Sequence, residues 1–226
     1  MKRLVVLSGA GMSAESGLAT FRDSGGLWEG HDVTAVASPE GWEQNPGMVL
    51  DFYNERRRQA LTSQPNQGHK ILAALENYFE VTIITQNVDD LHERAGSTKV
   101  IHLHGSLFKS RSSIDMSLTY DIQGDIRLGD ICEKGSQLRP DIVWFGEPVF
   151  LMETAAQITR KADIFVVVGT SMAVYPAAGL IHYTKDNALV YIVDPQIPPV
   201  GHRDNLVFIE EKATVGMKKL QDLLIA

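Results

Sequence analysis

Six short runs of apolar residues, rich in Val and Ile, recur along the chain and alternate with segments of helical periodicity. The apolar runs cover residues 3–8, 81–85, 100–103, 164–169, 189–193 and 207–209. Helical patterns occupy residues 66–78, 151–160 and 214–224. Runs that are apolar on both faces are typical of parallel strands covered by helices on either side. The alternation therefore predicts an α/β fold with a doubly wound, Rossmann-like parallel sheet.

Two regions interrupt this alternation. Residues 38–63 read as helical throughout, with Pro39 and Pro46 placed to open helices. Residues 107–139 show no helical period, but apolar and polar residues alternate within 113–122, which predicts a strand with one apolar face. That face would carry Ile114, Met116, Leu118, Tyr120 and Ile122, and the apolar residues that can pair with it are Ile126, Leu128 and Ile131.

We expect these two regions to form a small module inserted into a single domain that spans residues 1–226. The large Rossmann-like part would comprise residues 1–33, 75–105 and 140–226. The small module would comprise a helical insertion, 34–74, and a β insertion, 106–139. Each well-buried aliphatic side chain contributes about 1.5–3 kcal/mol, so a few of them can hold such a module together.

The composition limits which partners and which cellular compartment fit the chain. The formal net charge of −7 argues against a broad nucleic-acid surface, which needs clustered Lys and Arg. Cys132 is the single cysteine, so no disulfide can form within the chain and a reducing compartment fits best. The N-terminal apolar run stops at Ser8, short of a secretory signal, and run 164–169 is far too short to span a membrane. We therefore expect a soluble, cytoplasmic protein with no membrane or nucleic-acid partner.

A glycine-rich stretch, LSGAGMSAESGLATFR, follows the first apolar run. Ligands of open parallel sheets bind beyond the carboxyl ends of the strands, and glycines there allow backbone N–H groups to approach a phosphate. Residues 9–14 fit the dinucleotide pattern G-x-G-x-x-A, although a tight turn without a ligand would explain them too. A dehydrogenase needs a second strand ending in an acid about 20 residues on, whereas residues 18–32 read as a loop.

Polar residues also follow other predicted strands. Asn87 and Asp89 suit ribose hydroxyls and an amide, but they would also cap a helix. His102 and His104 are two apart on a strand and point the same way, so they could begin a metal site, pack at a sheet edge or act as acid and base. Asp194 ends another strand, where an acid binds ribose hydroxyls and repels a 2′-phosphate.

Two further segments could bind a substrate. Tyr53 and Arg56 are three apart on a predicted helix, where a phenol and a guanidinium can grip a carboxylate. Helix geometry alone favours the alternative that residues 56–58 form a solvated basic face while Tyr53 packs. The segment DIVWFGE, 141–147, mixes apolar residues with Trp144, which we expect to be exposed, although a core strand is the alternative.

Taken in order, the motifs GAGMSAESG, FRD, TQNVDDLHERAG, HLHGS, VWFGE and VVGTSMAVYPAA resemble the sirtuins, which are NAD-dependent protein-lysine deacylases. The resemblance implies a large Rossmann-type part and a small module of helices with, usually, a zinc ribbon. Tyr53 and Arg56 match the bacterial class III subclass, which removes succinyl and malonyl as well as acetyl groups. Asp194 departs from the pattern, because sirtuins often carry Asn there.

The resemblance also implies residue roles. His104 would be the catalytic base, with Asn87 beside it in the catalytic site. Residues expected at NAD are Gly9, Ala10, Gly11, Met12, Ser13, Ala14, Glu15, Phe21, Arg22, Trp28, Gln86, Asn87, Val88, Asp89, Gly169, Thr170, Ser171, Asp194, Pro195 and Ala213. Residues expected at the acyl-lysine peptide, which would add as a strand to segment 141–147, are Tyr53, Arg56, Val143, Trp144, Phe145, Gly146 and Glu147.

The reaction implied by the resemblance uses NAD as co-substrate and acylated lysine on proteins or peptides as substrate. It gives free lysine, nicotinamide and O-acyl-ADP-ribose, and we expect a monomer to perform it. An ADP-ribosyltransferase using the same NAD site is the alternative; a non-catalytic NAD-binding module is disfavoured by His104. The usual zinc ribbon needs four Cys or His ligands, but residues 106–140 contain only Cys132, so no structural zinc is expected.

Overall fold

A computed structural model describes residues 1–19, 27–28, 30–198, 200–201 and 203–225. Its main element is a parallel sheet of six strands in the order β11-β10-β9-β1-β4-β5. The strands are β1 (Arg3–Ser8), β4 (Glu80–Thr85), β5 (Val100–His102), β9 (Ile164–Val168), β10 (Leu189–Val193) and β11 (Leu206–Ile209). This order reverses between β1 and β9, as in doubly wound folds. The predicted α/β class is therefore confirmed.

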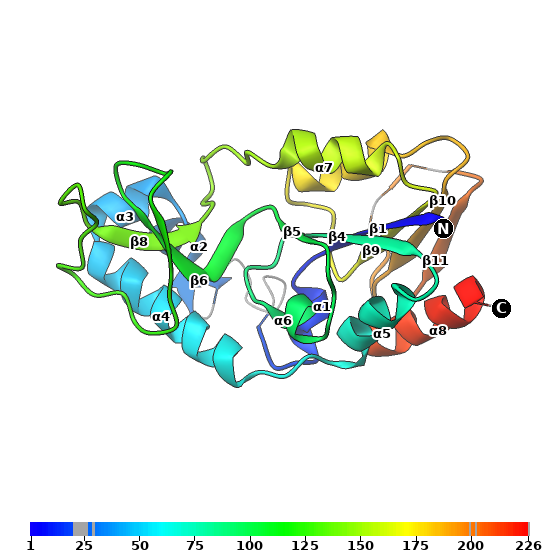
Figure 1. Ribbon diagram of the computed structural model, residues 1–226, viewed down its shortest axis with the longest axis horizontal. Coiled ribbons are helices and arrows are strands. Elements are labelled where there is room, and N and C mark those ends of the chain that lie inside the picture. The colour runs from blue at the N-terminus through cyan, green and yellow to red at the C-terminus, as the bar shows by residue number, and fades with distance from the viewer. Residues whose placement is uncertain (20–26, 29, 199, 202, 226) are drawn as a thin grey trace.

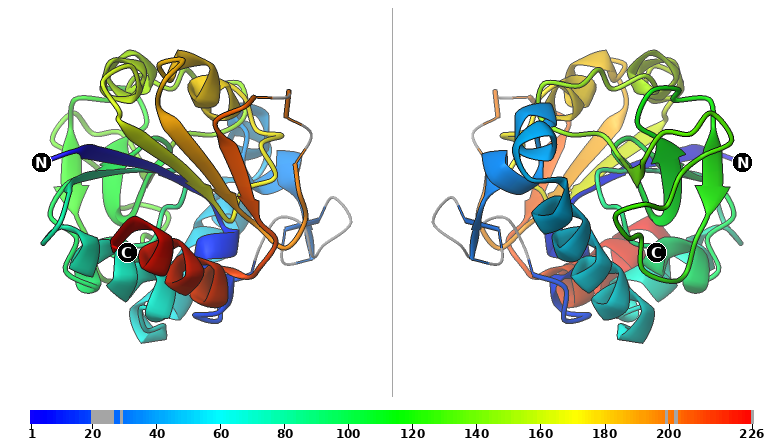
Figure 2. Two further views of the ribbon diagram at one scale, coloured as in Figure 1. Left: turned by 90° about the vertical axis from the view of Figure 1, so that its right-hand side faces the viewer. Right: turned by 90° about the vertical axis from the view of Figure 1, so that its left-hand side faces the viewer.

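Helices cover both faces of the sheet (Figures 1 and 2). On one face, α5 (Gln67–Leu75) packs against α8 (Ala213–Ile225), and on the other lie α7 (Met152–Thr159) and the 3₁₀ helix η1 (Ala177–Tyr183). Each face buries its own apolar cluster, so the strands are apolar on both sides as their sequences require. The helix predicted from residue 66 is confirmed: the Asn66 side chain caps α5 by accepting from two of its N–H groups.

A second, smaller module lies beside the sheet, at the left in Figure 1. It contains α2 (Val33–Val36), α3 (Pro39–Gln44) and α4 (Pro46–Thr62), packed on an antiparallel sheet of three strands. Its strands, in the spatial order β7-β6-β8, are β7 (Thr119–Asp121), β6 (Gly105–Ser112) and β8 (Leu138–Ile142). Pro39 and Pro46 stand at the first turns of α3 and α4, so the predicted helix starts are confirmed.

The long strand predicted over residues 113–122 is wrong. Only β7 is extended there, and the residues before it turn, which leaves Ile114 69% and Met116 48% exposed. The turn forms because the Asp115 carboxylate accepts from both the N–H and the hydroxyl of Ser117. Leu128 and Ile131 are exposed as well, and only Ile126 of the proposed partners is buried. The alternating pattern thus marks a polar turn rather than one apolar face.

A buried arginine holds this part of the small module instead. Arg57 is 1% exposed, and its guanidinium donates to the carbonyl oxygens of Leu107, at 2.6 Å, and Gly124, at 3.2 Å. It also donates to the Asn54 side chain, which in turn forms two hydrogen bonds with the backbone of Ile126. Arg57 therefore joins α4 to β6 and to the loop after β7, and it does not belong to a solvated basic face.

The packing also shifts the expected boundary between the two parts. The α5 side chains Ile71, Leu72 and Leu75 lie in the core of the large sheet, so α5 belongs to the large part. Ile142 and Trp144 lie instead in the core of the small module. The small module consequently includes residues as far as 144 and excludes α5, because the sheet faces, and not the chain order, decide where a helix packs.

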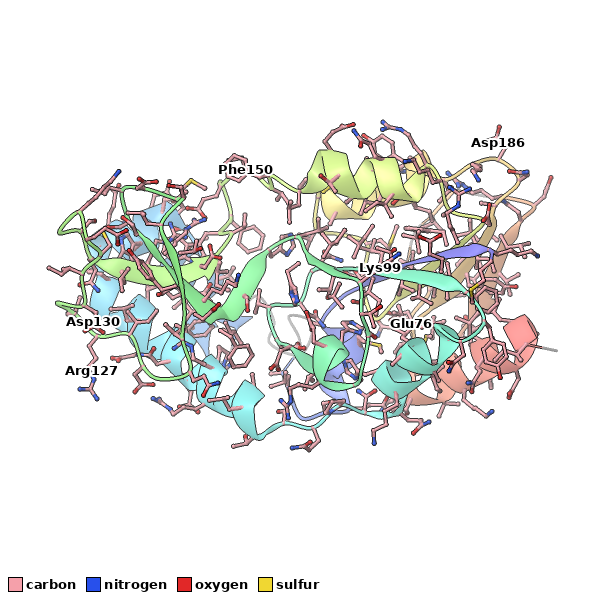
Figure 3. All side chains as sticks on the ribbon, in the orientation of Figure 1. Glu76, Lys99, Arg127, Asp130, Phe150 and Asp186 are labelled. Atoms are coloured by element: carbon pink, nitrogen blue, oxygen red, sulfur yellow. The ribbon has the colours of Figure 1, made fainter. Side chains whose placement is uncertain are left out.

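The remaining short elements lie at loops. The described part of 18–32, expected to be a loop, contains the hairpin of β2 (Leu27–Trp28) and β3 (His31–Asp32). The others are α1 (Gly11–Ala14) and α6 (Leu91–Arg94). No helix among the described residues is long and apolar enough to cross a membrane. In Figure 3, Arg127 and Asp130 mark the far tip of the small module, and Phe150 marks the link to α7.

Candidate active site

Two glycine turns meet where the strand order reverses. The Gly9 N–H donates to the Val168 carbonyl at 3.0 Å, and the Gly11 N–H donates to the Gly169 carbonyl at 2.8 Å. A Cβ atom on Gly11 would lie 2.8 Å from the Gly169 Cα, so the glycines permit a close contact between the two loops. The Gly9 and Gly11 N–H groups thus bind carbonyls at the end of β9 and in the loop after it, and the approach of this turn's N–H groups to a phosphate stays a prediction.

A cavity of about 840 Å³ extends from these turns to the small module. It is lined by His104 and by every residue predicted for the cofactor and the substrate whose side chain the structure describes, with the exception of Met12. Met12 is fully buried in the core beneath the sheet, and Trp28 is described only as part of β2. Phe21 and Arg22 lie outside the described residues. The topology thus brings together the ends of five strands, β1, β4, β5, β9 and β10, and several segments of the small module.

The lining also contains residues that sequence analysis did not single out, among them Leu18, Ala37, Gln59, Tyr175, Pro176 and Lys212. Tyr175 and Pro176 belong to the motif VVGTSMAVYPAA, so that motif was the available signal. Glu15, predicted at the cofactor, lines the cavity, but its carboxylate accepts from the N–H and hydroxyl of Thr214 at the start of α8. It therefore also fixes the last helix to the glycine turn.

A buried hydrogen-bond network lies behind the glycine turn. The Ser13 hydroxyl donates to the Asp89 carboxyl at 3.0 Å and accepts from the Asn87 side-chain amide at 3.1 Å. All three residues are at most 7% exposed. Burial raises the pKa of Asp89, although hydrogen bonds from Leu91 and Ser13 oppose the shift. Because the Asn87 N–H₂ is directed at Ser13, its amide orientation is fixed.

Two uncharged histidines, which sequence analysis missed, support this network. The His69 Nδ1 accepts from the Asn66 N–H, so its Nε2 carries the proton that faces the Ser13 hydroxyl at 3.5 Å. His92 contacts the Ser8 hydroxyl at 2.9 Å. The rings of His69 and His92 meet edge to face, with their centroids 4.9 Å apart. Burial lowers the pKa of His69 to about 4 and that of His92 well below its ordinary value. Positions 69 and 92 looked like ordinary helix residues in the sequence.

His102 and His104 face the same loop but differ in charge. The His104 Nδ1 lies 3.1 Å from the Gln86 carbonyl, so Nδ1 carries the proton and Nε2 is left with a lone pair. Burial lowers the pKa of His104, and the bond to Gln86 offsets only part of this shift. Both nitrogens of His102 face acceptors, the Asn87 carbonyl at 3.0 Å and the Glu93 carboxylate at 2.7 Å. His102 is therefore an imidazolium, and His104 is the histidine able to accept a proton.

Tyr53 and Arg56 line the cavity on the small-module side. Tyr53 is fully buried, and burial raises its pKa, so the phenol stays neutral and retains its O–H donor. Arg56 is half-buried, with its guanidinium carbon 5.4 Å from the Phe52 ring centroid. Its neighbour Arg58 is exposed and pairs with Asp125. The solvated-face alternative thus holds for Arg58 and not for Arg56.

The segment 143–147 forms the adjoining wall. The Val143 N–H donates to the His104 carbonyl and the Phe145 N–H to the Ala37 carbonyl, each at 2.9 Å. The expectation that Trp144 is exposed is wrong: it is 2% exposed, and its Nε1 donates to the Tyr53 hydroxyl at 3.1 Å. The wall consequently connects His104 directly to the pocket of Tyr53 and Arg56.

At the opposite end of the cavity, the Asp194 carboxylate accepts from the Gln196 N–H at 2.9 Å and is 3% exposed. Ala213, Pro195 and Lys212 lie at the same end.

In the described part of the chain, no three His, Cys, Asp or Glu side chains are grouped to hold a metal ion. Near Cys132, the Lys134 amine and Asp115 carboxylate pair at 2.6 Å.

Comparisons with known proteins agree with this geometry. The model of the Sir2 family matches residues 9–176. An NAD-dependent protein deacylase of Helicobacter pylori is 52% identical over 225 residues, covering 100% of this chain and 96% of that protein. One of Bacteroides thetaiotaomicron is 52% identical over 232 residues, covering 100% and 99%. A crystal structure of a Sir2 homologue with NAD is similar with a TM-score of 0.88 at 37% identity, covering 99% of this chain and 90% of that one.

Proposed function

The chain belongs to the Sir2 family and is an NAD-dependent protein deacylase, and from that premise we propose that it removes succinyl and malonyl as well as acetyl groups from lysine. The observation that carries the proposal is the position of Tyr53 and Arg56, which line the same cavity as His104 and the glycine turns. The cavity therefore combines an acyl pocket with a cofactor site.

The cavity suits NAD along its length. Buried Asp194 supplies a carboxylate for ribose hydroxyls at one end, and Asn87, held by Ser13, supplies an oriented amide at the other. When bound, NAD supplies a ribose that loses nicotinamide and accepts the acyl group. One water is consumed, and the products are free lysine, nicotinamide and O-acyl-ADP-ribose.

His104 acts as the general base. Its Nδ1 proton is committed to the Gln86 carbonyl, so Nε2 is the atom that takes a proton from a ribose hydroxyl. Because burial lowers the pKa of His104, the imidazole is unprotonated at neutral pH and ready to accept. His104 also lies next to the acyl wall, since its carbonyl accepts from Val143.

Tyr53 and Arg56 bind the carboxylate of an acidic acyl chain. A guanidinium gives two parallel hydrogen bonds to a carboxylate, and a neutral buried phenol adds a donor. The Arg56 guanidinium packs against the Phe52 ring, and such apolar surroundings strengthen its interaction with an opposite charge. A shorter acetyl group fits the same cavity without reaching these donors.

The test is to incubate the protein with NAD and a peptide carrying acetyl-lysine or succinyl-lysine and to weigh the peptide products. We expect both peptides to lose their acyl groups, whereas a gain in mass by ADP-ribose would favour the alternative transferase. Arg56→Met should lower desuccinylation about 10- to 100-fold, the value of a hydrogen bond to a charged group, and spare deacetylation. Arg58→Met on the same helix is the matched control and should change neither. An equal loss with both peptides on Arg56→Met would contradict the proposal.

A further inference from the structure

Arg139, on β8 of the small module, lies behind the acyl wall without lining the cavity. Its guanidinium donates to both oxygens of the Glu147 carboxylate, at 2.7 and 3.1 Å, and to the Ile142 carbonyl at 2.9 Å. Arg111 of β6 donates to the same carboxylate at 3.1 and 3.2 Å. Arg139 and Arg111 are 7% and 5% exposed. Arg139 is therefore held in one plane by three acceptors.

The same guanidinium lies over Trp144, with its carbon 3.2 Å from the ring centroid. The Glu147 carboxylate also accepts from the Trp144 N–H at 2.8 Å, so one carboxylate fixes both the guanidinium and the backbone beneath it. The indole is thus held from above by Arg139 and at its backbone by Glu147. Its Nε1 then donates to the Tyr53 hydroxyl, the group that faces the acyl chain in the proposed function.

We propose that Arg139 is a positioning residue for acyl recognition, which acts through Trp144 to set the orientation of the Tyr53 hydroxyl. The inference rests on the proposed function. A planar guanidinium can contact the whole indole face and still form parallel bonds with a carboxylate, whereas the ammonium of Lys is a compact point charge that cannot do both. Because the Tyr53 oxygen accepts from the indole, its own proton is directed away from Trp144.

A double-mutant cycle tests this chain of contacts. Arg139→Lys keeps the charge beside Glu147 and loses the planar contact with Trp144. We expect the KM for a succinylated peptide to rise about three- to tenfold, with little change in kcat or in the KM for an acetylated peptide. Tyr53→Phe alone should raise the KM for the succinylated peptide about tenfold. In the Tyr53→Phe background, Arg139→Lys should add less than about twofold, because the residue through which it acts is gone.

Trp144→Phe provides a second route that keeps an aromatic ring under the guanidinium and removes only the indole donor. It should raise the KM for the succinylated peptide more than the KM for the acetylated peptide, and it keeps the test valid if Arg139→Lys does not fold. Equal losses for both peptides, or losses that multiply in the double mutant, would overturn the inference. If Tyr53→Phe and Arg56→Met both leave desuccinylation intact, the proposed function itself is wrong. If they impair it while Trp144→Phe and Arg139→Lys do not, only this inference fails.

Discussion

The two walls of the cavity are built from different chemistry. The cofactor wall consists mainly of uncharged groups, the Ser13 hydroxyl, the Asn87 amide and the imidazole of His69, joined by hydrogen bonds around one buried carboxyl. The acyl wall is held by a buried group of ions in which Glu147 accepts from two guanidinium groups. Uncharged groups can be buried once each has a partner, but buried charges must also be balanced. The walls should therefore respond differently to substitution and to pH.

The largest effect is expected at His104, where the cofactor wall meets the reacting atoms. Removing a general base lowers the rate by about 10²- to 10⁴-fold, so His104→Ala should reduce kcat by that factor. NAD binding, measured by calorimetry, should persist because Ser13, Asn87 and Asp89 stay in place. A kcat within tenfold of the original would show that another group accepts the proton.

The next largest effect is expected at Glu147, where a substitution should lower the free energy of unfolding more than a matched substitution in the cofactor wall. Glu147→Gln leaves Arg139 and Arg111 without their shared negative charge, and breaking a buried ion pair costs about 3–5 kcal/mol. Ser13→Ala is the matched change in the uncharged wall and should cost only about 1–3 kcal/mol. Urea denaturation measures both free energies of unfolding, and equal values would remove the distinction.

Acid should weaken the uncharged wall first. The pKa of His69 is about 4 in the folded chain against an ordinary value of 6.5, so below pH 6.5 the unfolded chain takes up a proton that the folded chain refuses. The free energy of unfolding then falls as pH decreases from 6.5 to 4, by up to about 1.4 kcal/mol per pH unit.

The contribution of Glu147 to the free energy of unfolding is lost over a lower pH range than that of His69. Burial opposes ionisation of Glu147, but bonds from Arg139 and the Trp144 N–H lower its pKa below the ordinary 4.5, so its contribution is present above pH 4.5 and lost below it. Denaturation curves between pH 4 and 7 measure how the free energy of unfolding depends on pH. This dependence should be weaker in His69→Gln than in the original protein. An unchanged dependence in that variant would contradict the assignment of an uncharged His69.

The smallest effect is expected at the exposed tip of the small module. Lys134→Met breaks the 2.6 Å pair with Asp115, in which the two side chains are 56% and 25% exposed, and solvent screens such a pair so that it contributes little to stability. The loss should shrink further in high salt, unlike that of Glu147→Gln. Parallel melting curves at low and high salt measure the contrast, and a salt-independent loss as large as that of Glu147→Gln would place the pair among the buried ions.

The fold and much of the site could be predicted because they depend on local signals. Apolar runs marked β1 and β9, prolines marked the helix starts, and the glycine turn sat at a strand end. The errors arose where distant residues decide the outcome. Trp144 is buried because residues distant in the chain, among them Tyr53, Arg139 and Trp42, pack against it. The alternation around Ile114 resembled a strand, but Asp115 closed a turn with its own neighbours. His69 became part of the site through Ser13, far away in the chain.

The contact between Gly11 and Gly169 has a consequence for anyone who redesigns this enzyme. The two turns fit together backbone against backbone, since a Cβ on Gly169 would lie 2.3 Å from the Met12 nitrogen. They can therefore be exchanged only as a matched pair. A chimera that imports one turn from another enzyme, with any larger residue at the point of contact, would force apart the two strands that frame the cleft.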